Sequence, residues 1–449
     1  MSIFQSSILS EASSFGDAVA LLDRVSGQSV RYSELAAFLS ARLGSLQFNR
    51  SKPVATWASA GFSHATFLLA LLAENGVVAP LSPHLPNPEA LKRASWIGAD
   101  LLWTAQGVTR LNPVRPLFHV RSEGTLLFTS GSSGSPSAVW HNLESHISNA
   151  QAAAGRILLG PGCGWLLSLP LHHVSGFSIL IRCLLAGATV VFPETNAPLK
   201  RQVEDPAVTH LSVVGVQLRR LLTQGASFRH LQAVLAGGGP IDAKLVSDSI
   251  KAGVPLRLTY GMTETASQIA TSGRLVAEPL HIHSGRPLPG REVRISADGE
   301  IQVRGPILPQ AIFTEKGRRQ ATCSDGWFAT GDVGGFDGEG NLIITGRRNR
   351  MFISGGENIC PEVIENLLAS CDGVRRAVVV GVPHVEFGMR PVAFVAGPAS
   401  VECMVDFLRS RLERFCVPDV FFPWPRAVGD QDAKVNYEIF SRLAVEAMD

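Results

Sequence analysis

The sequence predicts an α/β protein that consists of a large N-terminal part and a small α+β C-terminal part. Helix-like apolar patterns alternate with short β-branched runs, such as 77–81 and 188–192, and Gly or Pro marks the junctions. The chain also has 449 residues, which exceeds the roughly 250–300 residues at which a single hydrophobic core stops growing. We therefore expect at least two domains.

Strand patterns dominate the sequence after about Arg286. Residues 292–304 alternate apolar and polar side chains around an Asp298-Gly299 turn, which predicts a pair of short strands. Residues 337–345 predict another hairpin, closed near Gly338-Glu339-Gly340. This strand-rich portion follows the α/β portion without a low-complexity linker, so we assign both to the large domain.

Another change of pattern follows Arg347. The sequence predicts a helix over 361–368, strands over 376–382 and 392–395, and a helix over 401–415. Together these elements make an α+β unit of about a hundred residues, which is a usual size for an independent domain. We place the boundary near Asn349, with one domain over 1–348 and a second over 349–449.

Composition argues against several classes of protein. Forty Lys and Arg against 38 Asp and Glu give a formal net charge of +2, so no strong field favours nucleic acid or an anionic membrane. The seven cysteines are scattered and contain no Cys-x-x-Cys pair, which argues against a disulfide framework and a zinc site. The N-terminus lacks a signal-peptide pattern, and no run of about 18 apolar residues occurs. We expect a cytoplasmic protein without a membrane span.

A short apolar strand, Leu126-Leu127-Phe128, leads directly into a loop rich in hydroxyls and glycine. Small residues let a backbone approach a polyphosphate, and N–H groups and hydroxyls can donate to its oxygens. The loop therefore reads as a phosphate cradle, although a flexible Ser/Gly surface loop is the alternative for this segment alone. Without a following Gly-Lys-Ser/Thr it is not a Walker P-loop, and no kinase signature set occurs. The loop residues are Thr129, Ser130, Gly131, Ser132, Ser133 and Gly134.

This loop resembles the phosphate-loop signature of the adenylate-forming superfamily, which includes acyl-CoA synthetases, luciferases and the adenylation domains of peptide synthetases. Further segments resemble the other signatures of the superfamily, in the same order along nearly the whole chain: 169–176, 236–240, 260–264, 299–305, 330–332 and 346–347. The resemblance implies a large domain of α/β subdomains with a distorted β-barrel portion, a small mobile C-terminal domain, and activation of a carboxylic acid as an acyl-adenylate with ATP.

The resemblance also implies roles for individual residues. In the segments for adenine and magnesium, Gly238, Gly239, Tyr260 and Gly261 would bind the nucleotide, Thr263 would donate to the α-phosphate, and Glu264 would hold Mg²⁺. A carboxylate suits such a hard cation. Asp332 and Arg347 would bind the ribose, since one carboxylate can accept from two vicinal hydroxyls.

The C-terminal domain would carry the remaining catalytic group. Lys434 matches the lysine of the family that binds carboxylate and phosphate oxygens during adenylation. Asn349 stands at the hinge position, where family members usually have Asp, and a rotation there would let the thiol of coenzyme A approach. Gly355 and Gly356 would line the pantetheine tunnel, although a left-handed turn explains two glycines equally well. The run from Ser354 to Pro361 resembles acyl-CoA ligases, so coenzyme A is the expected acceptor.

The segment around His173 and Arg182 indicates the acid. It resembles the o-succinylbenzoate:CoA ligases of menaquinone and phylloquinone synthesis, whose substrate retains a second carboxylate in the acyl pocket. Arg182 is the candidate partner for that carboxylate, because a buried anion needs a fixed cation. An Arg that reaches from a helix end to solvent is the alternative. His173 is expected to orient the pocket, with a catalytic contribution through substrate placement and not as a base.

Alternative functions remain open at the level of sequence. CoA ligases for other aromatic or medium-chain acids share the same signatures. A non-catalytic nucleotide-binding member is also compatible with one departure from the family, because Ser137 stands where related enzymes usually have a loop lysine. The small-molecule acid, ATP and coenzyme A are the expected partners, and the sequence leaves a homo-oligomer possible.

Overall fold

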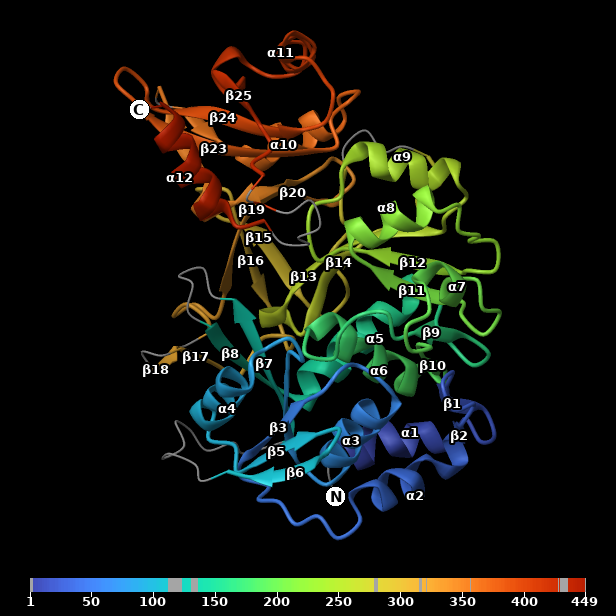
Figure 1. The fold of residues 1–449 in the computed structure, drawn as a ribbon. Helices are drawn as coiled ribbons and strands as arrows, with labels where there is room; N and C mark the ends of the chain where they lie inside the picture. Colours follow the sequence, from blue (N-terminus) through green and yellow to red (C-terminus); the bar gives the residue numbers. More distant parts are fainter. Residues whose placement is uncertain are drawn as a thin grey trace.

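The computed structural model describes residues 3–111, 123–130, 136–277, 282–314, 317–319, 321–355, 357–426, 428 and 435–448. Figure 1 shows a large body made of α/β layers and a strand-rich portion, with a smaller C-terminal unit, in orange and red, above it. This architecture confirms the predicted α/β fold with a small α+β C-terminal domain.

The first sheet contains the N-terminal strands and has the order β14-β13-β12-β11-β9-β10-β1-β2. Its strands are β1 (Val19–Asp23), β2 (Ser29–Arg31), β9 (Gly164–Leu166), β10 (Thr189–Phe192), β11 (His210–Val213), β12 (Ala233–Ala236), β13 (Leu256–Met262) and β14 (Ser267–Thr271). The run from β13 to β1 is parallel, and β14 and β2 join its two ends in antiparallel pairings. The carboxyl ends of such parallel strands are the usual ligand-binding edge of an open α/β sheet.

The second sheet carries the hairpin that flanks the predicted phosphate loop and has the order β18-β17-β8-β7-β4-β3-β5-β6. Its strands are β3 (Pro53–Trp57), β4 (Val77–Leu81), β5 (Leu101–Thr104), β6 (Gly107–Arg110), β7 (Gly124–Ser130), β8 (Pro136–Asn142), β17 (Ala311–Thr314) and β18 (Gly317–Arg319). The predicted strand over 126–128 lies within β7, which pairs in antiparallel fashion with β8. β17, from much later in the chain, pairs with the free edge of β8.

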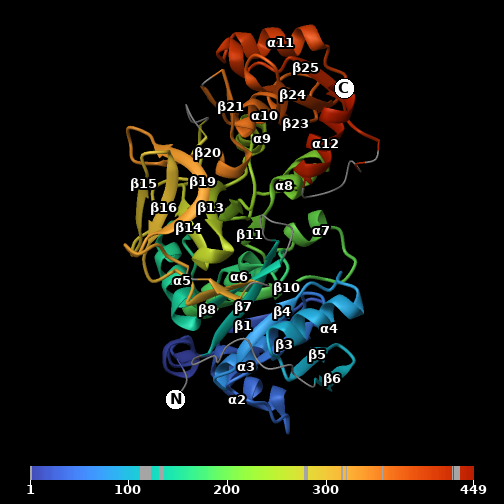
Figure 2. The same cartoon turned by 90° about the vertical axis from the view of Figure 1, so that its left-hand side faces the viewer.

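The strand-rich portion forms an antiparallel sheet with the order β15-β16-β19-β20. Its strands are β15 (Glu292–Ile295), β16 (Glu300–Arg304), β19 (Phe328–Phe336) and β20 (Leu342–Arg347). Gly299 has φ +79°, the left-handed conformation that the predicted Asp298-Gly299 turn requires. Both predicted hairpins are therefore confirmed. We call this four-stranded sheet the half-barrel, and Figure 2 shows it beside β13 and β14.

Helices cover the sheets of the large body. They are η1 (Phe4–Leu9), α1 (Ser10–Ser13), α2 (Tyr32–Leu43), α3 (Phe62–Ala73), α4 (Asn87–Trp96), α5 (Leu143–Ile157), α6 (Val174–Ala186), α7 (Leu199–Val203), α8 (Gly215–Thr223) and α9 (Ala243–Lys251), with short 3₁₀ turns η2 (Thr263–Thr265) and η3 (Arg348–Arg350). Buried residues of α3, α5 and α6 share one core with residues of β1, β9 and β10. In the described part of the chain, no helix has both the length and the apolar character to cross a membrane.

The C-terminal unit follows η3 and has its own sheet and core. Its elements are β21 (Phe352–Ser354), β22 (Glu357–Ile359), α10 (Pro361–Ala369), β23 (Arg376–His384), β24 (Gly388–Ala396), α11 (Val401–Arg409), η4 (Arg414–Cys416), β25 (Val420–Pro423) and α12 (Tyr437–Met448). The sheet order is β22-β21-β24-β23, with β25 paired in parallel to β24.

The prediction of one helix over 401–415 was too long. α11 ends at Arg409, because the side chains of Ser410 and Arg411 both donate to the backbone carbonyl of Phe407, at 2.8 and 3.1 Å. These side chains satisfy a carbonyl that a continued helix would have used for its backbone ladder. The remaining residues form the separate turn η4.

Candidate active site

The backbone is packed so closely at the carboxyl end of β12 and at that of β13 that glycine is required at both. At Gly237, a Cβ would lie 2.6 Å from the carbonyl oxygen of Thr259. At Gly261, a Cβ would lie 1.9 Å from the carbonyl oxygen of Ser267. Gly238 has φ +76°, and Gly239 has open space on its Cβ side. The predicted adenine segments therefore lie at the carboxyl ends of two neighbouring parallel strands, with glycine at the points of closest backbone packing.

A tight turn holds Thr263 and Glu264 between β13 and β14. Both residues lie in η2, and the turn is completed by two non-glycine residues in left-handed conformations, Ala266 with φ 49° and Ser267 with φ 113°. Burial raises the pKa of the Glu264 carboxyl, and the charges of Arg347 and Arg319 oppose that rise. Mg²⁺ is commonly held by one or two carboxylates together with substrate phosphates. One partly buried carboxylate at this position fits that requirement.

Asp332 brings together two residues that the sequence analysis assigned separately. The hydroxyl of Tyr260 donates to Asp332 Oδ2 at 2.7 Å, and Arg347 Nε lies 2.7 Å from Asp332 Oδ1. Burial raises the pKa of Asp332, while Arg347 and Tyr260 act in the opposite direction. The carboxylate is buried and the arginine is half exposed, so the cluster reaches the protein surface through Arg347.

Arg347 also links this cluster electrostatically to Glu264, because its positive charge opposes the burial-induced rise in the pKa of both Asp332 and Glu264. The structure thus gathers Tyr260, Asp332, Arg347 and Glu264, which come from three separate signatures. Thr263 precedes Glu264 in the same turn.

The strands on either side of the predicted phosphate loop are part of the second sheet. Thr129 and Ser130 end β7, where they pair with Ser137 and Pro136 of β8. The loop residues Gly131, Ser132, Ser133 and Gly134 lie outside the described residues.

His141 connects β8 to the turn that carries Thr263 and Glu264. Its Nε2 lies 2.7 Å from the carbonyl oxygen of Thr263, and the imidazole is completely buried. Since a carbonyl only accepts, Nε2 carries the proton. Burial lowers the pKa of His141 to about 4, which keeps the ring neutral near neutral pH. The sequence analysis missed this residue, because a histidine in a strand gives no signal about its partner.

Arg182 points into the protein from α6, which excludes the solvent-reaching alternative. The side chain is 4% exposed and donates from Nη2 to Ser267 Oγ at 3.0 Å, and its guanidinium lies 5.6 Å from the Trp165 ring centre. Among the described residues its Nε is buried with no hydrogen-bond partner, and the charged neighbours that act on it include no carboxylate. Burial lowers the pKa of Arg182 to about 10, so the group remains a cation at neutral pH.

His146 of α5 lies on the same side of the site as Arg182. Burial, together with the charges of His141 and Arg182, lowers its pKa well below the usual value. Its Nε2 is 2.8 Å from Thr125 Oγ1, whereas Nδ1 is buried and has no hydrogen-bond partner in the described part of the chain. A cation and a neutral imidazole with unused hydrogen-bonding atoms make this interior region suited to an anionic or polar ligand.

His173 occupies a different position from Arg182 on the same helix. It is the exposed N-cap residue of α6, with its ring 4.4 Å from that of the half-buried His172. The two predicted acyl-pocket residues therefore lie at the start and within the last turns of α6.

Asn349 lies exposed in η3, between β20 of the half-barrel and β21 of the C-terminal unit. Gly355 has φ +60° and donates its N–H to the carbonyl of Phe387 at 2.9 Å, so a left-handed turn accounts for this glycine. Gly356 and Lys434 lie outside the described residues.

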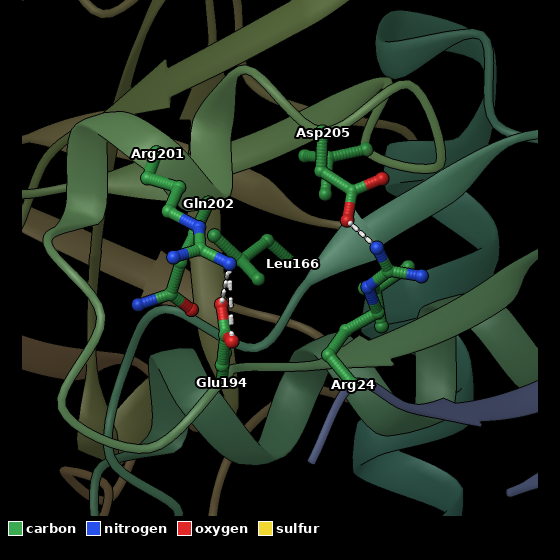
Figure 3. A pocket seen from close by; sticks show the side chains of 8 residues that line it. Arg24, Leu166, Glu194, Arg201, Gln202 and Asp205 are labelled. Atoms are coloured by element: carbon green, nitrogen blue, oxygen red, sulfur yellow. Dashed lines mark hydrogen bonds and ion pairs between the residues drawn. The ribbon is translucent and has the colours of Figure 1, made fainter. Parts of the chain in front are cut away.

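A small cavity of about 60 Å³ lies elsewhere, next to α7. Figure 3 shows that its two arginines each face a carboxylate: Arg24 lies 2.5 Å from Asp205, and Arg201 lies 3.2 Å from Glu194. The charges at this cavity are thus already paired, in contrast to that of Arg182.

Comparison with known proteins decides the family. The AMP-binding enzyme model matches residues 121–309, and the model of the AMP-binding enzyme C-terminal domain matches residues 363–426. The chain is 32% identical over 432 residues to the 2-succinylbenzoate–CoA ligase of Haemophilus influenzae, and the alignment covers 92% of each chain. The chain belongs to the AMP-binding enzyme family.

Other members of the AMP-binding enzyme family are also similar. The match to the 2-succinylbenzoate–CoA ligase of Listeria monocytogenes is 36% identical over 275 residues, which spans 60% of this chain and 59% of that relative. The o-succinylbenzoate CoA synthetase of Bacillus subtilis has been solved with the acyl-adenylate OSB-AMP, with a TM-score of 0.80, 27% identity and 94% of each chain covered. Its complex with ATP and magnesium has a TM-score of 0.78 and 26% identity, over 93% of this chain and 95% of that one.

Proposed function

We propose that this protein is an ATP-dependent, AMP-forming acid:CoA ligase that converts 2-succinylbenzoate into 2-succinylbenzoyl-CoA, as in menaquinone or phylloquinone synthesis. We choose this acid because Arg182 is a buried cation that has no carboxylate partner among the described residues. A cation in the interior is stabilised by a substrate that delivers a second carboxylate, whereas a monoacid would leave it unpaired.

In the first half-reaction the acid carboxylate attacks the α-phosphorus of ATP and pyrophosphate leaves. Tyr260 and the glycine edge would receive the adenine, and Asp332 with Arg347 would bind the ribose hydroxyls. The N–H groups and hydroxyls from Thr129 to Gly134 would hold the phosphates, with Thr263 donating to the α-phosphate. Such fixed donors stabilise charge that develops in the transition state. Mg²⁺ bound at Glu264 would neutralise phosphate charge.

In the second half-reaction the thiol of coenzyme A attacks the acyl carbonyl and AMP leaves. We assign residues 1–348 to the nucleotide- and acyl-binding domain and 349–449 to the mobile domain, with Asn349 as the hinge. Lys434, three residues before Tyr437 at the start of α12, would serve adenylation and then withdraw. His173, at the N-cap of α6, would orient the acid.

A panel of acids tests this proposal. Pyrophosphate release is measured with ATP, Mg²⁺ and either 2-succinylbenzoate, benzoate, or octanoate, each with and without coenzyme A. We expect 2-succinylbenzoate to give the highest kcat/KM and to form a thioester only when coenzyme A is present. A higher kcat/KM for benzoate or octanoate would reassign the acid, and a lack of pyrophosphate with every acid would indicate a non-catalytic nucleotide-binding protein.

A further inference from the structure

A buried carboxylate joins the C-terminal unit to the strand that ends in the ribose-binding arginine. Glu362, in the first turn of α10, is 6% exposed. Its Oε1 accepts a hydrogen bond from the backbone N–H of Arg347 at 3.2 Å and another from Arg350 Nη1 at 2.8 Å. The first of these bonds crosses from one side of Asn349 to the other.

The strand is shaped to receive this carboxylate. A Cβ on Gly346 would lie 2.5 Å from Glu362 Oε2 and 3.0 Å from its carboxyl carbon. Glycine at this position therefore lets the carboxylate lie directly against β20. Oε2 is buried and has no hydrogen-bond partner among the described residues. A buried acceptor without a partner costs free energy, so this oxygen weakens the contact with β20.

The other partners of this network all belong to the C-terminal unit. Arg350 also donates to Glu365, with Nη2 to Oε1 at 2.7 Å and Nη1 to Oε2 at 3.1 Å, and to the carbonyl of Val379 at 3.0 Å. The guanidinium stacks on the ring of Tyr437, 3.6 Å from the ring centre. If the unit turns about Asn349, these groups move together. Such a turn must break the contact of Glu362 with Gly346 and Arg347.

We propose that Glu362 is a positioning residue that latches the C-terminal unit to β20 and so sets the balance between the two half-reactions. This inference rests on the proposed function, because it requires two half-reactions that use different orientations of the unit. The latch acts on Arg347 through its backbone, while the Arg347 side chain holds Asp332. Release of the latch thus removes one backbone contact of the proposed ribose-binding arginine at the same step as the domain turns.

The decisive variants are Glu362→Gln and its matched control Glu365→Gln. Both remove one negative charge beside Arg350 from the same face of α10, but the hydrogen bonds that the structure describes for Glu365 go to Arg350 and to the N–H of Val379, with none to β20. Gly346→Ala is a third variant, which displaces the carboxylate from β20 without changing any charge.

Each variant is assayed for acid-dependent ATP:pyrophosphate exchange and, separately, for thioester formation from supplied acyl-adenylate and coenzyme A. Because one charge-assisted hydrogen bond is lost, we expect Glu362→Gln and Gly346→Ala to change the ratio of the two rates about tenfold. Glu365→Gln should leave the ratio within about twofold. Equal loss of both rates in Glu362→Gln, or an equal change of ratio in Glu365→Gln, would overturn the proposal.

A second measurement does not depend on turnover. Cys323 in the large body and Cys403 in the C-terminal unit are exposed, so spin labels on them report the distance between the two parts. We expect Glu362→Gln to broaden the distance distribution relative to wild type, and Glu365→Gln to leave it unchanged. An unchanged distribution in Glu362→Gln refutes the latch. Failure of the acid panel with a broadened distribution would instead refute only the proposed reaction.

Discussion

At the scale of single residues, Arg182 is the clearest case of a side chain whose surroundings demand a ligand. Its guanidinium contacts the Ser267 hydroxyl and the Trp165 indole ring, and its charge acts on the imidazole of His146. A carboxylate that enters this region gains a charge-assisted partner and at the same time relieves the desolvation of the arginine. The same arrangement disfavours an acid with a purely apolar tail.

Arg182→Ala should therefore alter selectivity more than general activity. We expect kcat/KM for 2-succinylbenzoate to fall about a hundredfold, since removal of one member of a buried charge pair costs roughly 2–5 kcal/mol. For benzoate-like monoacids the fall should be less than about tenfold. The measurement is pyrophosphate release with both acids, with Arg201→Ala at the cavity of Figure 3 as the control. An unchanged ratio between the acids would remove Arg182 from the acyl pocket.

At the scale of elements, β8 ties the phosphate-loop hairpin to the turn η2 through His141. The bond to the Thr263 carbonyl requires a proton on Nε2, and both neutral and charged imidazole satisfy that. The charged ring, however, is destabilised by burial, so the pKa is lowered from 6.5 to about 4. Above pH 6.5 His141 is neutral in both the folded and the unfolded chain, so it does not affect the free energy of unfolding. Between pH 6.5 and 4 it is protonated in the unfolded chain but not in the folded one, so the free energy of unfolding decreases as the pH falls.

This linkage predicts that His141→Gln removes the share of the acid-dependent loss of stability that comes from His141. For a shift from 6.5 to about 4, stability falls by about 2 kcal/mol between pH 7.5 and pH 5. Glutamine can still donate to the Thr263 carbonyl but does not titrate. Urea unfolding of both proteins at these two pH values measures the difference, and parallel losses in the two proteins would contradict the assignment.

Local patterns predicted the elements that depend on neighbours in sequence. The hairpins at Asp298-Gly299 and 337–345, the strand before Thr129 and the helix from Pro361 follow from alternation and turn residues. Pairings between segments that are distant in the sequence have no comparable local pattern. Three contacts join segments that lie far apart in the sequence: the pairing of β8 with β17, the hydrogen bond of His141, and the latch at Glu362. The local pattern of each segment does not indicate which other segment it contacts. The gathering of the Asp332 cluster was predictable only through resemblance to a family.

At the scale of the whole molecule, the two parts on either side of Asn349 divide the proposed chemistry. The groups proposed to bind the nucleotide and its metal ion, Tyr260, Asp332 and Glu264, all lie in the large body. Lys434 belongs to the other part by sequence. This division of residues fits a reaction in which the large body holds the adenylate. The C-terminal part would then move and place different groups beside it in each half-reaction.

Lys434→Ala tests this division. We expect acid-dependent ATP:pyrophosphate exchange to fall by at least about a thousandfold, because a charged donor to the reacting oxygens is lost. Thioester formation from supplied acyl-adenylate should stay within about threefold of wild type, since the lysine is not needed there. Rates are measured by exchange of labelled pyrophosphate and by thioester absorbance. Comparable loss in both assays would show that Lys434 has a structural role.

The pairing of β17 with β8 has a consequence for how the chain is made. One edge of β8 stays unpaired until residues 311–314 of β17 have been synthesised. One edge of β1 likewise stays unpaired until β10 has been synthesised. Contacts of such long sequence separation form slowly, and open strand edges invite pairing with other chains. During translation the nascent N-terminal half therefore carries exposed β edges that only later segments can cover. Fragments that stop before Ala311 should aggregate, and the large body has to be produced as one piece.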